Sequence, residues 1–416
     1  MYYWTADDGV TTRAVNLNSL GGTVGISNAS PTVITLTTVL ANGTPVKFAS
    51  TGTLPTGISA STTYYLENVA ANLTCNISTS PGGSLVNTSS AGSGTFSIAT
   101  LVDVPIYQNY MVVSDVSRFV IAFGCNDYGS VIQDPMLVRW SDQEDALNWT
   151  PTATNQAGSL RLSHGSQIVT AIQNRQEIVV ITDSSVYNMQ YLGPPYVWNA
   201  QLLADNISIV GQNSWATASG VIYWMGVDKF YKYDGRVQTL RCDLRQYIFS
   251  DINTSQADQI FAGTNEGFNE VWWFYCSANS TVVDLYVVYN YLENIWYYGS
   301  MGRTAWLDSG LFDYPIAATY SNNLVYHEYG VDDNTSGTPA AITASITSSE
   351  TDLDDGDSLM FIRRVLPDLT FRGSSAASPS GVLTLKPLKN SGSGYTSPAS
   401  VGGGDNATVT RTATVP

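Results

Sequence analysis

A run of carboxylates, ETDLDDGDS from Glu350 to Ser358, is the densest set of side chains in this chain that could bind a cation. A calcium loop of the EF-hand type needs Gly at its sixth position and Asp or Asn at its first, third and fifth positions. With Gly356 in sixth place, these positions fall on Thr351, Leu353 and Asp355, so two of the three ligands are missing. The run therefore predicts a solvated acidic turn rather than a metal site.

The two histidines offer little support for nucleophilic or general-base chemistry. His164, in RLSHGSQ, has no Ser or Cys nucleophile with a supporting motif beside it, because the GxSxG pattern is absent. His327 lies between Tyr326 and Glu328 in an expected strand, where it is predicted to pack or to face solvent. The phosphate-binding pattern GxxxxGKS or GxxxxGKT and a GxGxxG after a strand are also missing. We predict no catalytic, cofactor-binding or metal-binding residue.

The cysteines do not form a zinc pattern. They are far apart, without a CxxC and without a nearby histidine, at Cys75, Cys125, Cys242 and Cys276. A disulfide is possible, but free and mostly buried thiols are favoured.

Chemistry on carbohydrates is the remaining alternative. The segment SDQEDALNW, from Ser141 to Trp149, faintly resembles the acidic turn with a following Trp in sialidase propellers, but it lacks the Gly of that motif. A glycosidase needs two carboxylates about 5–9.5 Å apart on either side of one sugar, and nothing in the sequence points to such a pair. Several aromatic residues could stack on sugars, but in alternating strands they are expected to form core between neighbouring sheets: Trp272, Trp273, Trp296, Tyr297 and Tyr298.

The composition is that of a large β-rich protein. The 416 residues are 44% hydrophobic but only 12% charged, against about 25% in an average protein. The net charge of -16 and the lack of a basic run argue against a protein that wraps duplex DNA, which needs clustered Lys and Arg. No signal peptide is evident after Met1, and no window approaches the ~20 apolar residues of a membrane helix, so no membrane insertion is expected.

One strand-and-turn phrase rich in aromatic residues recurs through the middle of the chain. Its copies are MLVRWSDQEDALNW from Met136, SSVYNMQYLGPPYVW from Ser184, DKFYKYDGRVQTL from Asp228, LYVVYNYLENIWYYG from Leu285 and NNLVYHEYG from Asn322. Their centres lie 49, 44, 58 and 38 residues apart, at Trp140, Met189, Tyr233, Tyr291 and Tyr329. One four-stranded blade of a β-propeller takes about 40–50 residues. The phrases predict an all-β fold built around a β-propeller of five or six blades.

Changes in composition divide the chain into four parts. Residues 1–15 are expected to form an aromatic hairpin that belongs to the propeller, with a turn at Asp8-Gly9. Residues 16–102 are poor in aromatics, and the alternation in TVITLTTV together with a turn at Asn42-Gly43 predicts an inserted small β-sandwich or barrel. The propeller follows at 103–335, where the only helical signal is one turn near Ser255. Residues 336–416 are expected to form a β-rich platform or assembly module.

The expected C-terminal module is an antiparallel β structure. It would contain a strand of small residues from Thr338 to Thr347, the acidic turn, and a last alternating strand in ATVTRTATV. Because no closing turn follows that last strand, we expect its partner on another subunit or on a further piece of chain. Arg363 and Arg364 are expected to face opposite sides of their strand, and one of them to pair with an acidic loop or an adjacent subunit.

Whole segments of the chain resemble tail-tube or nozzle proteins of short-tailed, double-stranded DNA bacteriophages. The resemblance is carried by VRWSDQEDALNWTPTATNQAGSLRLSHGSQIVTAIQNRQEIVVITDSSVYNMQYLGPPYVW, DNISIVGQNSWATASGVIYWMGVDKFYKYDGRVQTL, FAGTNEGFNEVWWFY and YVVYNYLENIWYYGSMGRTAWLD. It covers residues 103–335 strongly and 340–416 moderately. No active-site residue carries over, because the likeness is one of segments and not of a catalytic motif.

The resemblance implies a structural virion protein of the phage tail, assembled in the cytoplasm of the bacterial host. Six copies would form a hollow nozzle below the portal and adaptor proteins, with a docking surface for tail fibres or spikes. Genome DNA would pass through without specific binding, and six chains of net charge -16 would carry -96 to repel its phosphates. No cofactor and no enzymatic activity are expected. The alternatives are a receptor-binding or fibre-anchoring tail protein and, less favoured, a glycan-degrading propeller enzyme.

Overall fold

The computed structural model describes residues 2–3, 15–16, 22–37, 40, 42–99, 103–348, 364, 366, 380–385 and 407–412. Contacts divide the chain into two compact units, Met1–His327 and Glu328–Pro416. Nearly all the regular structure is β, as the sequence predicts.

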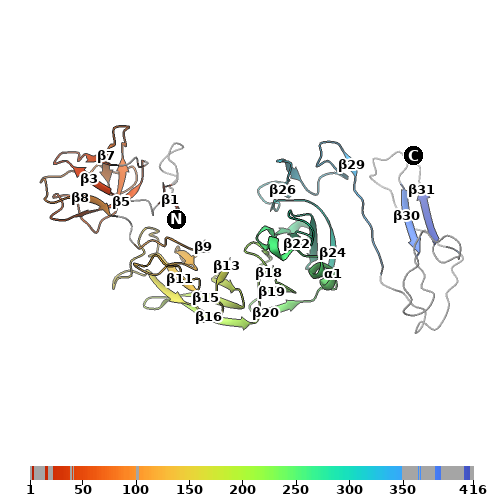
Figure 1. The fold of residues 1–416 in the computed structure, drawn as a ribbon. Coiled ribbons are helices and arrows are strands. Elements are labelled where there is room, and N and C mark those ends of the chain that lie inside the picture. The colour runs from red at the N-terminus through yellow and green to blue at the C-terminus, as the bar shows by residue number, and fades with distance from the viewer. Residues whose placement is uncertain are drawn as a thin grey trace. The chain divides into compact units, whose positions relative to one another are not determined.

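Five antiparallel sheets follow one another along the first unit, and each is a meander in which neighbours in sequence pair (Figure 1). The first holds β9 (Tyr110–Val113), β10 (Val120–Phe123), β11 (Leu137–Trp140) and β12 (Gly158–Arg161). The second holds β13 (Ile168–Asn174), β14 (Glu177–Thr182), β15 (Ser185–Gly193) and β16 (Val197–Asp205). The third holds β17 (Trp215–Ala218), β18 (Val221–Met225), β19 (Phe230–Tyr233) and β20 (Val237–Leu240). The fourth holds β21 (Phe261–Asn265), β22 (Glu270–Tyr275), β23 (Leu285–Asn290) and β24 (Ile295–Ser300), and the three-stranded fifth holds β25 (Ala305–Leu307), β26 (Ile316–Ala318) and β27 (Leu324–Tyr326).

Each sheet packs on the next because alternate residues of a strand point to opposite faces, and both faces of the middle strands are apolar. In β22, for example, all six residues are buried. Trp273 points toward the third sheet and packs in one core with its Phe230. The preceding residue, Trp272, points to the opposite face and packs with Trp306 of the fifth sheet. Two further cores join the first sheet to the second and the second to the third. The stack is therefore held by four successive layers of buried side chains.

In three pairs of neighbouring sheets, the first strands lie next to one another. Contacts join β9 to β13, β17 to β21, and β21 to β25. Asn213, just before β17, forms a parallel bridge with Phe261, so β17 and β21 begin at the same side. Because four antiparallel strands run up and down an even number of times, the chain leaves each such sheet at the same end at which its first strand began. This convergence of first strands is the blade arrangement of the predicted propeller.

The recurring phrase marks the same place in every sheet, the third strand. Trp140 and Tyr233 end β11 and β19, and Met189 lies within β15. Tyr291 directly follows β23, and Tyr329 lies three residues after β27. The period in the sequence therefore corresponds to one sheet, and five phrases correspond to five sheets.

A six-stranded closed barrel precedes the stacked sheets, in the order β3-β4-β7-β6-β5-β8. Its strands are β3 (Gly22–Ile26), β4 (Ile34–Thr35), β5 (Pro45–Ser50), β6 (Tyr64–Glu67), β7 (Thr74–Ser78) and β8 (Phe96–Ala99). The predicted alternation is present, because Thr32, Ile34 and Leu36 are buried while the residues between them are exposed. Of the two expected forms, the barrel is the one observed. Before it, β1 (Tyr2–Tyr3) pairs with β2 (Val15–Asn16), and the expected turn at Asp8-Gly9 lies outside the described residues.

Helices are short. The turn predicted near Ser255 is the 3₁₀ helix Thr254–Gln259, and a second 3₁₀ helix spans Glu266–Phe268. The α-helix α1 (Arg245–Ser250) was not predicted, because its six residues carry no capping signal and a single buried side chain, Ile248, anchors it. No helix in the described part of the chain has the length and apolar content needed to cross a bilayer.

Two expectations for the second unit are wrong. The strand expected over Thr338–Thr347 is only β29 (Ala340–Ala341), paired with β28 (Asp332–Asp333); residues 342–348 are all exposed, Ile342 and Ile346 included, so no burial holds them in a sheet. The last strand, β31 (Ala407–Thr412), does not need another subunit, because it pairs with β30 (Ser380–Leu385) of the same chain over six positions. The acidic turn and Arg363 lie outside the described residues.

Candidate functional site

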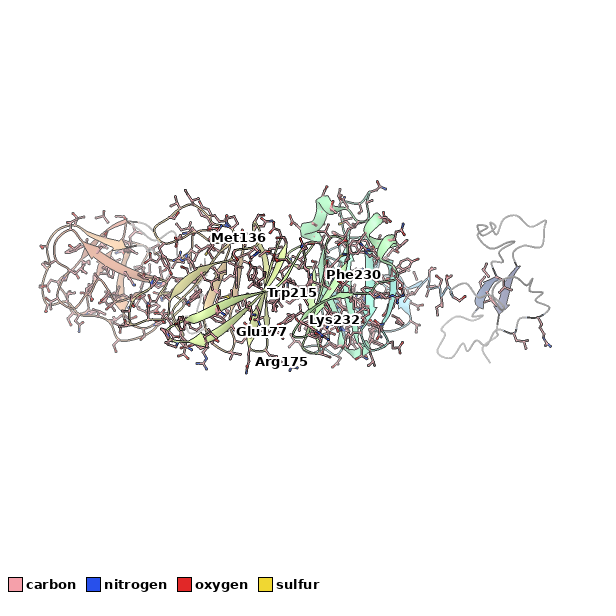
Figure 2. The ribbon with its side chains drawn as sticks, turned by 90° about the horizontal axis from the view of Figure 1, so that it is seen from below. Met136, Arg175, Glu177, Trp215, Phe230 and Lys232 are labelled. Carbon is pink, nitrogen blue, oxygen red and sulfur yellow. The ribbon has the colours of Figure 1, made fainter. Side chains whose placement is uncertain are left out.

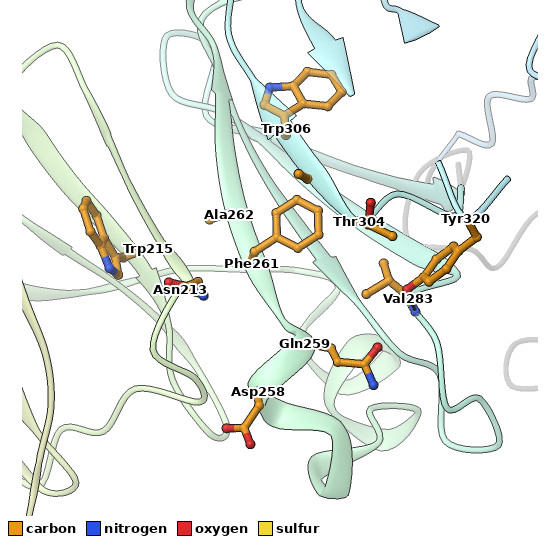
Figure 3. Close-up of a pocket in the computed structure, with 11 residues that line it drawn as sticks. Asn213, Trp215, Asp258, Gln259, Phe261, Ala262, Val283, Thr304, Trp306 and Tyr320 are labelled. Carbon is orange, nitrogen blue, oxygen red and sulfur yellow. Dashed lines mark hydrogen bonds between the residues drawn. The ribbon is translucent and has the colours of Figure 1, made fainter. Parts of the chain in front are cut away.

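A pocket of about 560 Å³ lies where the first strands of the third, fourth and fifth sheets begin (Figure 3). It is lined by Asn213, Trp215, Asp258, Gln259, Phe261, Ala262, Val283, Thr304, Ala305, Trp306 and Tyr320. The backbone fixes its floor, because the amide of Ala262 donates to the carbonyl of Asn213 at 2.9 Å. Its lining combines aromatic side chains with a few polar ones, and it is open to solvent.

The aromatic walls of this pocket are held in place by hydrogen bonds and stacking. The indole nitrogen of Trp306 donates to the carbonyl of Thr264 at 2.7 Å, and its ring stacks on Trp272 with centroids 5.2 Å apart. The hydroxyl of Tyr320 accepts from the amide of Val283 at 2.8 Å. The walls are thus set by the packing of the sheets.

The polar groups at the pocket do not form a hydrolytic pair. Asp258 is the single carboxylate among the lining residues, and it is exposed. A glycosidase needs a second carboxylate facing the first across the sugar. The lining therefore lacks the pair of carboxylates that glycoside hydrolysis requires.

A second pocket of about 550 Å³ lies at the opposite ends of the strands, between turns of the second and third sheets; Figure 2 labels Arg175 and Glu177, two of the residues that line it. Arg175 and Glu177 line it on one side, and Gly220 and Asp234 on the other. Glu177 accepts a hydrogen bond from the Asn188 side chain at 2.7 Å. Its carboxylate is therefore already used within the second sheet.

Glu270 is a buried carboxylate that the sequence analysis did not single out. Its side chain accepts hydrogen bonds from the Trp272 indole at 2.9 Å, the Asn265 amide at 3.3 Å and the Tyr297 hydroxyl. A buried carboxylate is stable only when its oxygens are satisfied in this way. The signal in the sequence is a Glu opening the apolar run VWWFY, where a charged residue must find partners. Its role is to join strands of the fourth sheet.

The histidines are placed outside any catalytic arrangement. The Ser163 hydroxyl lies 2.9 Å from Nδ1 of His164, but both residues are exposed neighbours in one loop, and no third group among the described residues orients the ring. The His327 ring packs 4.6 Å from that of Trp306, and its Nε2 accepts from Nε of Arg303 at 3.0 Å. His327 was expected either to pack or to face solvent, and it packs.

All four cysteines are free, as predicted, and three of them are buried. Burial raises the pKa of the Cys75 thiol to about 11 and that of the Cys125 thiol to about 12. Burial likewise raises the pKa of Cys242 to about 12. Thiols with such pKa values carry almost no thiolate at neutral pH and are poor nucleophiles and poor metal ligands. In the described ranges, no group of three or more His, Cys, Asp or Glu side chains could hold a metal ion.

The aromatic cluster that could have stacked on sugars is mostly core. Trp272 and Trp273 are buried on opposite faces of β22, and Trp296 packs 4.7 Å from Phe230. Tyr298 is the exception, because it is half exposed and packs against Tyr247 of α1 with ring centroids 4.5 Å apart. The aromatic residues at the pocket are different ones, and the sequence did not reveal them because they come from three separate sheets.

Comparisons with known proteins give no family for this chain. No protein-family model matches it, and no curated protein matches it. Among solved structures, an extracellular domain of the putative one-component system BT4673 from B. thetaiotaomicron is 10% identical with a TM-score of 0.34, covering 80% of this chain and 35% of that one. Hsv2 of Kluyvelomyces marxianus is 10% identical with a TM-score of 0.30, covering 55% and 63%. The endosialidase of phage phi92 is 11% identical with a TM-score of 0.24, covering 90% and 66%.

The chain thus spans about a third of the length of the first of these structures. At these TM-scores, none of the three bears on what the chain does.

Proposed function

We propose that this chain is a structural protein of the tail of a short-tailed, double-stranded DNA phage, and that six copies form its nozzle. The proposal rests on the resemblance of residues 103–335 to nozzle proteins. The observation that carries it is that residues 103–327 form one stack of sheets, joined by large buried aromatic side chains such as Trp224 and Trp273. A rigid stack of this kind suits a part whose task is to hold other components in position.

The absence of enzymatic activity is part of this proposal. The pocket at the first strands is lined by one carboxylate, that of Asp258. The buried carboxylate of Glu270 accepts hydrogen bonds from three neutral donors, so it is not available as a catalytic acid or base. We therefore expect no loss of polymer when the protein is incubated with host surface polysaccharide. Release of reducing ends by the wild-type protein would contradict this expectation.

The acidic charge supports a role in DNA passage. Six copies at -16 each carry -96, and such a field disfavours the adhesion of phosphates to the channel wall. In this proposal the DNA leaves through the nozzle without specific binding. Reversing the charge of lumen-facing acids should slow or stall ejection in a salt-dependent way, and unchanged ejection would remove the idea.

The decisive experiment is to determine symmetry. Electron microscopy of the purified protein and of virion tails should show a sixfold ring that contacts the adaptor on one side and fibres or spikes on the other. A trimer or a monomer at the tail periphery would contradict the nozzle and favour a receptor-binding or fibre-anchoring protein.

A further inference from the structure

In two places, the described part of the chain joins an Asn or an Asp to a following Gly, at Asn42-Gly43 and at Asp234-Gly235. In such a pair the amide nitrogen of the glycine can attack the side-chain carbonyl carbon of the residue before it, because no Cβ restricts the backbone there. In an unfolded chain the Asn pair reacts faster. Its side chain is a neutral amide, whereas an Asp at neutral pH is almost entirely a carboxylate, which nucleophiles attack poorly.

The structure reverses this order. We propose that Asp234 of the folded protein is converted to isoaspartate through a succinimide formed with Gly235, and that the fold protects Asn42 from the corresponding reaction. The proposal assigns a site of spontaneous covalent modification to the loop between β19 and β20. It does not depend on the nozzle proposal.

The loop leaves the attacking group of this reaction accessible. Asp234, Gly235 and Arg236 are all exposed. The amide of Gly235 makes no hydrogen bond to any described residue. The φ of Gly235 is +103°, and a Cβ at this position would meet no atom within 4 Å. Neighbouring groups therefore do not oppose the change of backbone conformation that brings this nitrogen to the side chain.

The carboxylate of Asp234 is held by weak contacts only. It lies 3.6 Å from Nζ of Lys232 and accepts a hydrogen bond from Nε2 of Gln238 at 3.4 Å. Both distances are long, and an ion pair at the surface contributes little. The side chain is therefore able to turn toward the amide of Gly235.

The Asn42-Gly43 turn differs at each of these points. Gly43 is buried, and its amide donates to the carbonyl of Leu66 at 2.7 Å. The side chain of Asn42 accepts a hydrogen bond from the amide of Val69 at 3.4 Å. Attack by the Gly43 nitrogen would break its bond and leave the carbonyl of the buried Leu66 without that donor, which carries a penalty. The barrel must therefore open before Asn42 can react.

The proposed reaction consumes no reagent except water. In molecules whose Asp234 carboxyl is protonated, the nitrogen of Gly235 loses its proton and bonds to Cγ, and the hydroxyl leaves as water. Water then adds to either carbonyl of the succinimide. Addition at the main-chain carbonyl breaks its bond to nitrogen and leaves the chain running through Cγ. The product is isoaspartate, with the same composition and one more methylene in the backbone.

The test is to store the folded full-length chain and the urea-unfolded chain at neutral pH for several weeks. A methyltransferase specific for isoaspartate then labels both samples, and mass spectrometry of their peptides locates the label. Mapping by peptide is needed because Asp8-Gly9 and Asp355-Gly356 lie outside the described residues. The folded sample should carry label at Asp234 and keep Asn42 intact, whereas in the unfolded sample Asn42 should be modified first.

Two variants confirm the chemistry at the loop. Asp234→Asn presents a neutral amide, whereas about one Asp carboxyl in a thousand is protonated at neutral pH, so the variant should be modified at least about tenfold faster. Asp234→Glu is the matched control. It keeps the charge, but its ring closure would need one more atom, so no label should appear at this position.

Label at Asp234 in the unfolded sample but not in the folded one would overturn the proposal. So would a folded Asp234→Asn variant that stays unmodified, because the loop would then not reach the reactive conformation. Equal deamidation of Asn42 in folded and unfolded wild type would refute the protection by the barrel. The symmetry of the assembled protein bears on none of these outcomes, so a failure here is distinguishable from a failure of the nozzle proposal.

Discussion

The guanidinium carbon of Arg139 lies 3.9 Å from the centre of the Tyr128 ring. Arg139 is fully buried on the face of the first sheet that points away from the second sheet, and it donates to the carbonyl of Asn126 at 3.0 Å and to that of Asp103. It makes no ion pair with any described carboxylate. This one cation therefore ties two connecting segments to that face of the first sheet.

We predict that Arg139→Met destabilises the protein by about 3 kcal/mol, since it removes charge-assisted hydrogen bonds and leaves buried carbonyls unpaired. The free energy of unfolding in urea, measured by tryptophan fluorescence, checks this. Arg236→Met is the control, because that side chain is exposed, and it should change stability by less than about 0.5 kcal/mol. A loss at Arg139 no larger than that of the control would contradict the assigned role.

Replacing Glu270 should lower the free energy of unfolding by an amount that depends on how many of its hydrogen bonds the new side chain keeps. Glu270→Ala leaves the donors of Trp272, Asn265 and Tyr297 without their acceptor, so we expect a loss of about 3 kcal/mol or more. Glu270→Gln keeps the shape but turns one acceptor into a donor, and about 1–2 kcal/mol should be lost.

Urea unfolding of both variants, with exposed Glu293→Ala as the control, measures this order. If the Gln variant were as unstable as the Ala variant, the shape of the side chain would not be the feature that matters. If both matched the control, the hydrogen bonds would contribute nothing.

The sequence predicted the parts of the fold that depend on local repetition. Trp140, Met189 and Tyr233 mark third strands because each sheet reuses the same pattern of turn and alternating apolar residues. The pocket could not be predicted in this way. Asn213, Asp258 and Thr304 come together only because the first strands of three sheets converge, and nothing in their own neighbourhoods signals it.

Two of the elements that the sequence misjudged show how burial overrides local pattern, one by adding a helix and the other by removing a strand. Helix α1 lacks a side-chain cap at Leu244, and tertiary burial of Ile248 supports it instead. The residues that follow Ala341 alternate between apolar and polar, but those up to Ser348 are exposed, Ile342 and Ile346 included, so no burial holds them in a sheet. Local sequence pattern predicts neither the helix nor the missing strand, because both depend on whether side chains are buried in the folded protein.

Asp183 should make stability depend on pH. Although burial opposes ionisation, hydrogen bonds from the Ser166 hydroxyl, the Ser166 amide at 2.8 Å and the Gln167 amide hold the pKa of this carboxyl below its ordinary value. A lowered pKa means that the folded protein holds the proton less tightly than the unfolded chain. The stabilisation is therefore complete above the unfolded pKa of about 3.9 and is lost as pH falls through the lower folded value.

Asp183→Asn keeps an acceptor for these donors but cannot titrate. We expect the urea midpoint of the wild type to fall more steeply below about pH 4 than that of the variant, while the two curves run parallel near neutral pH. Parallel curves over the whole acidic range would show that Asp183 does not contribute to acid sensitivity.

Gly263 in β21 should tolerate no side chain, because a Cβ there would collide with the indole ring of Trp306. That ring is stacked on Trp272 and bonded to the carbonyl of Thr264, so it cannot move aside without loosening the layer between the fourth and fifth sheets. We predict that Gly263→Ala costs about 1–3 kcal/mol, the usual range for overpacking. Gly267→Ala is the matched control, because its nearest neighbour would be 3.9 Å from the new methyl group. Urea unfolding of both variants measures the difference, and equal stability of the two would show that the layer accommodates the added methyl group.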